Sequence, residues 1–379
     1  MKLGILVFTS IFWGLLSCSN QQGEQNLISI ENTNSPHFSI SKKNDYKIIC
    51  IYGSSSQDTI ATYVLYHRGS KKPTLNFPAV FITTPVQRVA CLSSVYVGGL
   101  NELKLLDKII AVDNGNYILN KEIKMKIQRG QVAQIAITGN IETEKTILIK
   151  PDLVFSFASG VENDRSLMKL NDQGIPVVTC SEQLESTPLN RAAWIKVLAA
   201  FFEKDLLADS LYKNTVDRYQ LLSKKTESYL INHKNIRPKV ISEITYNGTW
   251  YVPGGRSFMS ALFKDAGAEY FLKDDHHSGS LPLSYEAVYL RNRTADYWLN
   301  VHGWISLNDC ILHDKRNAAF TAYKTGNIYN NTGQKSESGA NGYWENGVFS
   351  PDEILEDLIK IFHPSILPDH QLQYYKKLL

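Results

Sequence analysis

The sequence predicts an α/β protein of two βα lobes that one long helix joins, with a β-hairpin extension before the first lobe. Short apolar strand segments alternate with helical segments in both halves of the chain, a pattern typical of mostly parallel sheets. Between the halves, residues 189–236 contain no Pro or Gly and repeat apolar residues at helical spacing. Two aromatic and β-branched segments precede the first lobe and predict the extension.

The first residues have the features of a lipoprotein signal peptide over residues 1–17. A basic start precedes an apolar stretch of about 14 residues, shorter than the ~20 residues that span a bilayer. Leu15–Cys18 follows as a lipobox, in which Cys18 accepts the lipid. Residues 18–36 are rich in Asn, Gln and Ser and are predicted to be a flexible tether. We expect a lipid-anchored protein of the cell envelope, with an ordinary N-terminal anchor helix as the alternative.

Charge and cysteine spacing disfavour several function classes. The chain has 40 Lys and Arg against 37 Asp and Glu, a net charge of +3, so its charge does not point to a nucleic acid partner. The cysteines after the lipobox are far apart and lack C-x-x-C spacing, which disfavours a metal cluster or a dense disulfide framework. We therefore expect no resident metal or cofactor. Those cysteines are Cys50, Cys91, Cys180 and Cys310.

The predicted domains follow the chain in order. In the β extension, residues 37–84, Tyr46–Tyr52 and Thr59–Tyr66 form a hairpin around a Ser-rich loop. The linking helix, residues 189–236, ends at Arg237-Pro238 because proline cannot continue a helix. The N-terminal lobe is predicted over residues 85–188 and the C-terminal lobe over residues 237–379.

Common catalytic motifs are absent from the sequence. There is no G-x-S-x-G nucleophile elbow, no P-loop, no H-E-x-x-H and no G-x-G-x-x-G after a strand. Asp274, His276 and His277 could contact a metal together, but the Ser-Gly-Ser that follows them is typical of a solvated loop. The common enzyme classes are therefore disfavoured.

Segments that follow strands supply the candidate ligand-binding residues, because open α/β sheets bind ligands beyond the carboxyl ends of their strands. Gly254 and Gly255 allow close backbone approach. Trp250 and Tyr251 offer flat surfaces, and Arg256 offers a positive fork for an anionic group. The alternative is a turn with a buried aromatic residue and a surface arginine. Further candidates in the first lobe and near the C-terminus are Ser93, Ser94, Tyr96, Phe157, Ser159, Tyr343, Trp344 and Glu345.

Six segments stand in an order that is similar to one known family. They are Arg88–Ser94, Lys150–Val154, Gly174–Val178, Pro188–Ile195, Gly248–Gly255 and Ala295–Leu299. Together they resemble the class III solute-binding proteins of ABC importers for iron-siderophores, cobalamin and haem. Asn190, where the family usually carries Gly, and Ala193, where it often carries Glu, depart from the pattern. The resemblance runs from about Pro85 to the C-terminus and leaves the β extension outside.

This resemblance implies an inter-lobe cleft that binds a metal chelate and closes little, with ferric siderophore, corrinoid and haem left open. It also implies docking on an ABC permease with its ATPase through one acidic residue on each lobe. Glu144, eight residues before Asp152, and Glu286, ten before Asp296, match those positions. Alternatively, both carboxylates simply favour a helix N-terminus. A lipid-anchored α/β hydrolase and a structural surface lipoprotein are the alternative functions.

Overall fold

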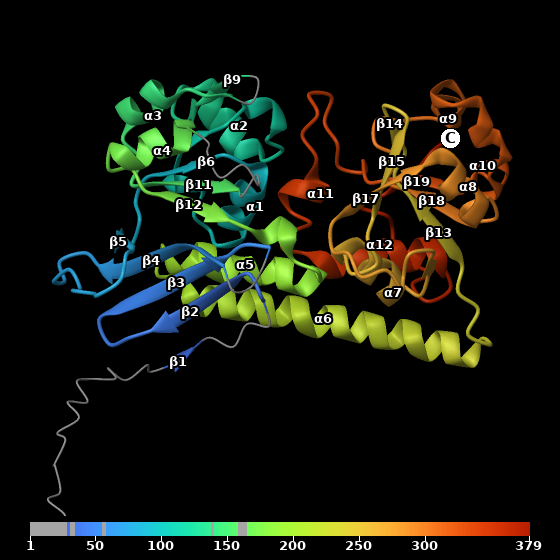
Figure 1. The fold of residues 1–379 in the computed structure, drawn as a ribbon, viewed down its shortest axis with the longest axis horizontal. Coiled ribbons are helices and arrows are strands. Elements are labelled where there is room, and N and C mark those ends of the chain that lie inside the picture. The colour runs from blue at the N-terminus through green and yellow to red at the C-terminus, as the bar shows by residue number, and fades with distance from the viewer. Residues whose placement is uncertain (1–28, 31–34, 55–57, 138–139, 158–164) are drawn as a thin grey trace, which may run out of the picture.

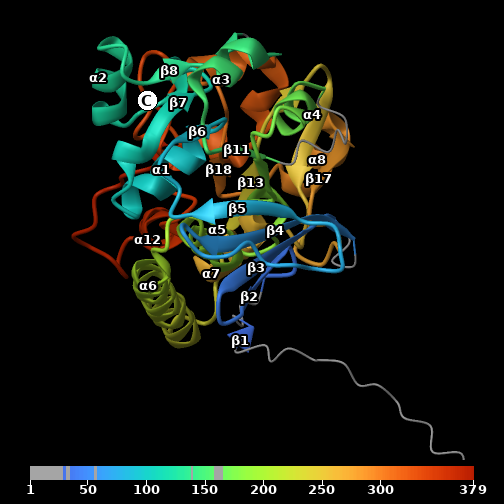
Figure 2. The ribbon, with the colours of Figure 1, turned by 90° about the vertical axis from the view of Figure 1, so that its left-hand side faces the viewer.

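The computed structural model describes residues 29–30, 35–54, 58–137, 140–157 and 165–379. Two α/β lobes stand side by side over one long helix, and a separate β-sheet lies beneath the N-terminal lobe (Figures 1 and 2). The predicted two-lobed α/β fold is confirmed. Cys18 and Ser159 lie outside the described residues. Within the described part of the chain, no helix is both long enough and apolar enough to cross a membrane.

The N-terminal lobe contains a five-stranded parallel sheet in the order β12-β11-β6-β7-β8. Its strands are β6 (Val89–Cys91), β7 (Ile109–Val112), β8 (Ala133–Gln134), β11 (Leu153–Phe157) and β12 (Val177–Cys180). Its helices are α1 (Ser94–Glu102), α2 (Lys121–Gln128), α3 (Thr143–Ile149) and α4 (Arg165–Asp172). A small antiparallel pair joins β9 (Ala136–Ile137) and β10 (Asn140–Ile141).

The C-terminal lobe contains a five-stranded sheet in the order β16-β13-β18-β19-β20, in which only β20 is antiparallel to its neighbour. Its strands are β13 (Lys239–Ser242), β16 (Glu269–Tyr270), β18 (Tyr297–Leu299), β19 (Ile328–Asn330) and β20 (Lys376–Lys377). An antiparallel sheet beside it joins β14 (Thr245–Tyr246), β15 (Thr249–Pro253) and β17 (Ser280–Ser284). Its helices are α7 (Phe258–Asp265), α8 (Tyr285–Asn292), α9 (Leu307–His313), α10 (Thr321–Lys324), α11 (Gly342–Glu345) and α12 (Pro351–Phe362).

The two lobes repeat one topology. The neighbouring strands β7-β6-β11-β12 of the first lobe correspond to β16-β13-β18-β19 of the second. Two helices correspond as well: α3 precedes β11 in the first lobe, and α8 precedes the equivalent strand β18 in the second lobe. Asp152 accepts a hydrogen bond from the Arg88 amide at 3.1 Å, and Asp296 accepts one from the Lys239 amide at 2.7 Å. Because these contacts tie equivalent strands together, α3 and α8 occupy equivalent places.

The segment predicted as one linking helix forms two helices, which corrects that boundary. Helix α5 (Pro188–Ala200) ends where Phe201 and Phe202 turn into the core, and Glu203 adopts a left-handed backbone with φ of 57°. Helix α6 (Asp205–Asn232) then runs beneath both lobes (Figure 1). The apolar period continues through the break, so the helical pattern alone did not mark it. The linking element is therefore α6.

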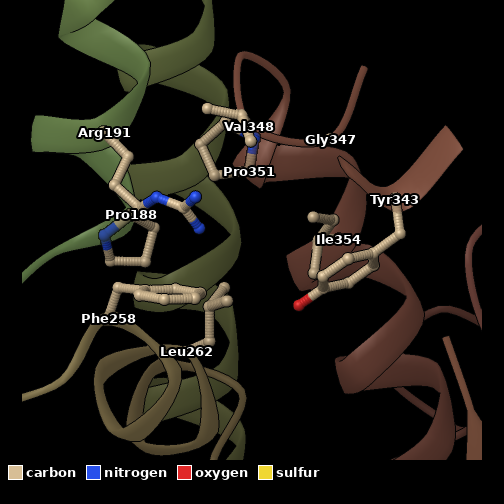
Figure 3. A pocket seen from close by; sticks show the side chains of 9 residues that line it. All are labelled: Pro188, Arg191, Phe258, Leu262, Tyr343, Gly347, Val348, Pro351 and Ile354. Carbon is tan, nitrogen blue, oxygen red and sulfur yellow. The ribbon is translucent and has the colours of Figure 1, made fainter. Parts of the chain in front are cut away.

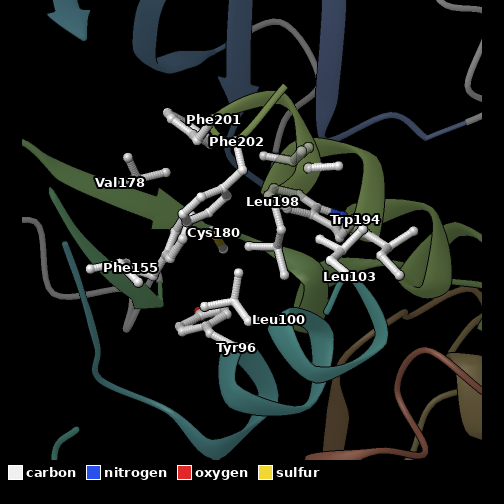
Figure 4. Packing of buried hydrophobic residues seen from close by; sticks show 14 of the residues in the cluster. Tyr96, Leu100, Leu103, Phe155, Val178, Cys180, Trp194, Leu198, Phe201 and Phe202 are labelled. Carbon is white, nitrogen blue, oxygen red and sulfur yellow. The ribbon is translucent and has the colours of Figure 1, made fainter. Parts of the chain in front are cut away.

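The β extension becomes a third layer of the N-terminal lobe. Its sheet, in the order β1-β2-β3-β4-β5, contains the predicted hairpin as the antiparallel pair β3–β4. The strands are β1 (Ser29–Ile30), β2 (Phe38–Lys42), β3 (Tyr46–Tyr52), β4 (Thr59–His67) and β5 (Val80–Thr84). The Phe38 and Trp194 ring centroids lie 5.0 Å apart, and the buried Tyr63 hydroxyl donates to the Val177 carbonyl at 3.0 Å. The extension, the N-terminal lobe and α5 thus share one hydrophobic core, and Figure 4 shows part of it around Trp194 and Phe201.

A second contact joins the lobes at α11, and it changes the role predicted for Glu345. A Cβ atom on Gly98 of α1 would lie 1.6 Å from the Glu345 carbonyl oxygen, so α1 and α11 approach as closely as only glycine permits. The buried Glu345 carboxylate accepts hydrogen bonds from the amides of Leu119 and Asn120, at 2.5 and 2.7 Å. Because its acceptor atoms are used across the lobe boundary, Glu345 is a lobe contact rather than a ligand-binding residue. Burial raises the pKa of its carboxyl.

We predict that Glu345→Ala lowers the free energy of unfolding by about 2–4 kcal/mol, because two partly buried amides lose their acceptor. Urea denaturation measures this loss. Glu337→Ala, which removes an exposed glutamate from the same segment, is the matched control and should change stability by less than about 0.5 kcal/mol. Equal stability of the two variants would show that Glu345 does not hold the lobes together.

Candidate ligand-binding cleft

A cavity of about 560 Å³ lies at the carboxyl ends of β13, β18 and β19. In open α/β sheets this edge is where ligands bind. Gln183, from the N-terminal lobe, also lines the cavity, so it is part of an inter-lobe cleft. The polar and charged side chains that line it are Gln183, Glu243, Ser257, Ser278, Ser280, Asn300, His302, Asn331, Thr332, Lys335 and Asn341.

Three cleft residues that follow strands have a left-handed backbone without being glycine. The φ angles of Glu243, Asn300 and His302 are 67°, 57° and 49°. Such conformations are costly and cluster at functional sites. The buried Asn300 side chain supports this arrangement, because it donates to the Ser242 hydroxyl at 3.2 Å and accepts from the Tyr375 hydroxyl at 3.0 Å. The polar groups of the cleft thus have fixed directions.

His302 and Glu243 form the charged centre of the cleft. His302 Nε2 lies 2.6 Å from Glu243 Oε2, and 63% of the histidine side chain is exposed against 19% of the glutamate. The hydrogen bond to Glu243 raises the pKa of His302 above its ordinary value of 6.5, although burial works against this shift. The exposed Lys335 lines the same cavity. The charged groups of the cleft are therefore Lys335 and the His302–Glu243 pair, and Lys335 is a cationic group that an anionic ligand can meet.

Two half-exposed aromatic side chains line the cleft, and both were predicted. Tyr251 is 48% exposed and Trp344 is 43% exposed. Their predicted companions are buried instead. Trp250 stacks on Trp298 with centroids 5.4 Å apart, and Tyr343 packs on Tyr375.

The misassignment of Trp250 has a simple physical reason. Successive side chains of a strand point to opposite faces, so Trp250 and Tyr251 of β15 cannot line one pocket. The Trp250 indole donates to the Ser242 carbonyl at 3.1 Å, deep in the core. Tyr343, within the single turn of α11, likewise faces the core while Trp344 faces the cleft. Both buried residues belong to the core and not to the ligand surface.

The predicted role of Arg256 is also wrong for this cleft. Arg256 lines a separate groove of about 1070 Å³ between α6, α7 and the 272–278 loop. Its amide donates to the His277 carbonyl at 3.0 Å. Gly254 and Gly255 do allow close approach, but the approaching backbone is that of the same loop. A Cβ atom would lie 2.2 Å from the His277 oxygen at Gly254, and 2.1 Å from the Leu272 oxygen at Gly255.

Ser93, Ser94, Tyr96 and Phe157, the first-lobe candidates that the structure describes, do not line the cleft cavity. Ser93 caps α1 by accepting from the Val95 amide at 3.3 Å, and Ser94 is the first residue of that helix. Tyr96 is buried in the lobe core, where its ring lies 5.7 Å from that of Phe155 (Figure 4). Phe157, at the end of β11, is 47% exposed but does not line the cavity.

Beneath the cleft, α5 and α7 pack through a cation–π contact. The Arg191 guanidinium lies 4.1 Å from the Phe258 ring centroid, and both side chains line a small pocket of about 10 Å³ that Tyr343 also borders (Figure 3). Phe258 also lines the ligand cleft above. Burial lowers the pKa of Arg191, while Glu182 opposes this effect. The floor of the cleft is thus part of the lobe interface.

Sequence reasoning did not identify the charged residues of the cleft. Glu243, Asn300 and Asn331 come directly after β13, β18 and β19. The rule that ligands bind beyond strand ends could have found them. In the C-terminal lobe it was applied only to residues 247–257, because that segment combined glycine with aromatic residues. His302 lies two residues beyond Asn300, and no sequence motif marked it as a cleft residue.

The remaining candidates concern metal binding and docking. In the described part of the chain, no three His, Cys, Asp or Glu side chains converge to hold a metal. His277 Nδ1 instead pairs with Asp275 at 3.0 Å.

The two predicted docking residues are both exposed. Glu144 lies in the first turn of α3. Glu286 lies in the first turn of α8, where it pairs with Arg316 at 2.9 Å.

Two copies of one βα topology above a common helix, with a polar and aromatic cleft at the inter-lobe edge, define a two-lobed binding protein. A model of the periplasmic binding protein family matches residues 89–334. The chain therefore belongs to the periplasmic binding protein family.

Similar proteins agree with this assignment. An uncharacterized lipoprotein of Methanocaldococcus jannaschii is 26% identical over 313 residues, which cover 78% of this chain and 70% of the relative. A periplasmic heme binding protein from Pseudomonas aeruginosa superposes with a TM-score of 0.56 at 15% identity, over 74% of this chain and 94% of the other. An ABC-type Fe³⁺-hydroxamate transport system from Saccharomonospora viridis gives a TM-score of 0.54 at 19% identity, over 74% and 94%. These two structures show the shared fold.

We predict that Glu243→Gln lowers the pKa of His302 toward 6.5, because the carboxylate that stabilises the imidazolium is lost. In the parent protein the pair contributes stability that is fully present below pH 6.5 and is lost as pH rises through the raised pKa of His302. NMR titration of the imidazole measures the shift, with Glu337→Gln as the control. An unchanged titration curve in Glu243→Gln would contradict the pairing.

Proposed function

We propose that this protein is the substrate-binding lipoprotein of an ABC importer and that it captures a metal chelate in the inter-lobe cleft. The observation that carries the proposal is the cleft at the ends of β13, β18 and β19, where His302 and Lys335 accompany Tyr251 and Trp344. Half-exposed aromatic rings suit the flat or apolar surface of a chelate, and the Lys335 ammonium suits an acidic substituent. Family membership supports binding as the function.

A metal chelate is the ligand class that the cleft and the similar proteins support together. A periplasmic heme binding protein and an Fe³⁺-hydroxamate transport protein share the fold. Haem and many siderophore complexes carry carboxylate or other anionic groups beside an apolar framework. The cavity volume of about 560 Å³ lies within the usual range for a small-molecule site. Ferric siderophore, corrinoid and haem are the three candidates.

Lipid anchoring is part of the same proposal. The lipobox Leu15–Cys18 supports it, and a similar protein of Methanocaldococcus jannaschii is named a lipoprotein. An anchor at Cys18 keeps the folded lobes at the cell envelope within reach of a membrane transporter. We propose that the transporter is an ABC permease with its ATPase, which contacts Glu144 on one lobe and Glu286 on the other.

The hydrolase alternative has less support than the binding function. The family of this chain consists of binding proteins, and the charged centre of the cleft is the His302–Glu243 pair. A structural surface lipoprotein would not need such a cleft, because a solid surface would serve that role.

We predict that Tyr251→Ala and Trp344→Ala each weaken chelate binding by about 1–3 kcal/mol, the usual scale for an aromatic anchor. Binding is measured by isothermal titration with haemin, a ferric hydroxamate siderophore and cyanocobalamin as separate probes. Tyr246→Ala is the matched control, because Tyr246 is exposed on the neighbouring β14 and does not line the cleft. Failure of all three probes to bind the parent protein would exclude the proposed chelates.

We predict that Cys18→Ser releases the protein from membranes, because only a thiol at that position can accept the lipid. Fractionation of cells followed by a high-salt wash measures this change, and Cys310→Ser provides a control in a buried cysteine that lies far from the signal peptide. Membrane retention of Cys18→Ser after the wash would contradict the lipid anchor.

A further inference from the structure

Helices α3 and α8 present the same pair of side chains to solvent at equivalent places in the two lobes. In α3 the pair is Glu144 and Leu148, and in α8 it is Glu286 and Leu290. In each helix the leucine follows the glutamate by four residues, so the two side chains lie on one helix face. The side chain of Leu148 is 79% exposed and that of Leu290 is 73% exposed.

Neither leucine contributes to the core of its lobe. Helix α8 buries Tyr285, Val288 and Asn292 on its inner face and leaves Leu290 outside. Helix α3 buries Thr146 and packs Ile147 and Ile149 against the core, while Leu148 points away. A single exposed leucine on a protein surface needs no explanation. The same Glu-x-x-x-Leu arrangement on two topologically equivalent helices does, because the lobes share little else in sequence at these helices.

We propose that Leu148 and Leu290 are the apolar anchors of the permease-docking surface, one on each lobe, beside the acidic residues Glu144 and Glu286. This inference rests on the proposed transporter partnership and adds the contacts that hold the complex. Charges at a rim mainly steer association, whereas buried apolar side chains slow dissociation. The partner is a membrane permease that carries two matching sites, each with a basic group next to an apolar pocket, spaced as α3 and α8 are.

The surrounding charges fit this arrangement. Among the residues that the structure describes, Glu144 makes no ion pair, so its carboxylate is available to a cation of the partner. Glu286 is held at 2.9 Å by Arg316, which also binds Asp314 at 2.7 Å. A cation of the permease can replace Arg316 at Glu286 while Arg316 keeps its bond to Asp314. Both helices lie above α6 in the view of Figure 1.

The test measures the affinity of the full chain for the permease–ATPase complex, purified from membranes of the source cell and reconstituted in nanodiscs. Surface plasmon resonance compares the parent with Leu148→Ser, Leu290→Ser and the double variant. The matched control is Leu206→Ser with Leu221→Ser, which removes two leucines of α6 that are 87% and 67% exposed. We expect each docking variant to bind about tenfold more weakly through faster dissociation, on the scale of burying one leucine side chain. Thermal stability and the control should not change.

A second pair of variants separates this inference from the proposed function. Glu144→Ala with Glu286→Ala should slow association, and its effect should shrink at high salt, whereas the effect of the leucine variants should persist. Unchanged binding by the leucine double variant, with loss in the glutamate variant, overturns the apolar anchors and leaves the transporter partnership intact. Parent-level binding by both sets overturns the docking surface, and a parent protein that does not bind overturns the partnership itself.

Discussion

The contact between α1 and α11 is the constraint on which the arrangement of the two lobes depends. Gly98 lies so close to the Glu345 carbonyl that no larger residue fits, and the Glu345 carboxylate holds two amides of the opposite lobe. Helix α6 supports both lobes from below, and the Arg191–Phe258 contact joins them between these two points. Three separated contacts leave little freedom for the lobes to rotate. We therefore expect the cleft to be largely formed before a ligand enters.

The restricted movement of the lobes bears on how the polar groups of the cleft are held. Glu243, Asn300 and His302 follow neighbouring strands and have left-handed backbones, which the lobe around them must stabilise. In return, their polar groups have fixed positions, so an incoming ligand does not have to order them. Because the floor of the cleft contains Phe258, which also packs on Arg191, the cleft lining and the lobe contacts share one side chain. A transporter that separated the lobes would disturb both at once.

The fold could be predicted from the sequence, whereas the cleft could be predicted only in part. Alternating strands and helices are local patterns, and they located most elements within a few residues. The break at Glu203 was missed because Phe201 and Phe202 continue the helical period while turning into the core. Tyr251 and Trp344 were found, but Trp250 was assigned to the cleft because strand alternation was not applied to it. The His302–Glu243 pair joins residues from two strands, and only the folded sheet brings them together.

The central claim is that a preformed cleft beyond β13, β18 and β19 holds the ligand while the lobes stay in contact. A crystal structure of the protein purified from its own cell envelope, with its natural ligand bound, tests this most directly. The account predicts a ligand against Tyr251, His302 and Trp344, with the Glu345 carboxylate still bonded to the opposite lobe. A ligand in the groove of Arg256, or lobes that have separated at Glu345, would contradict it.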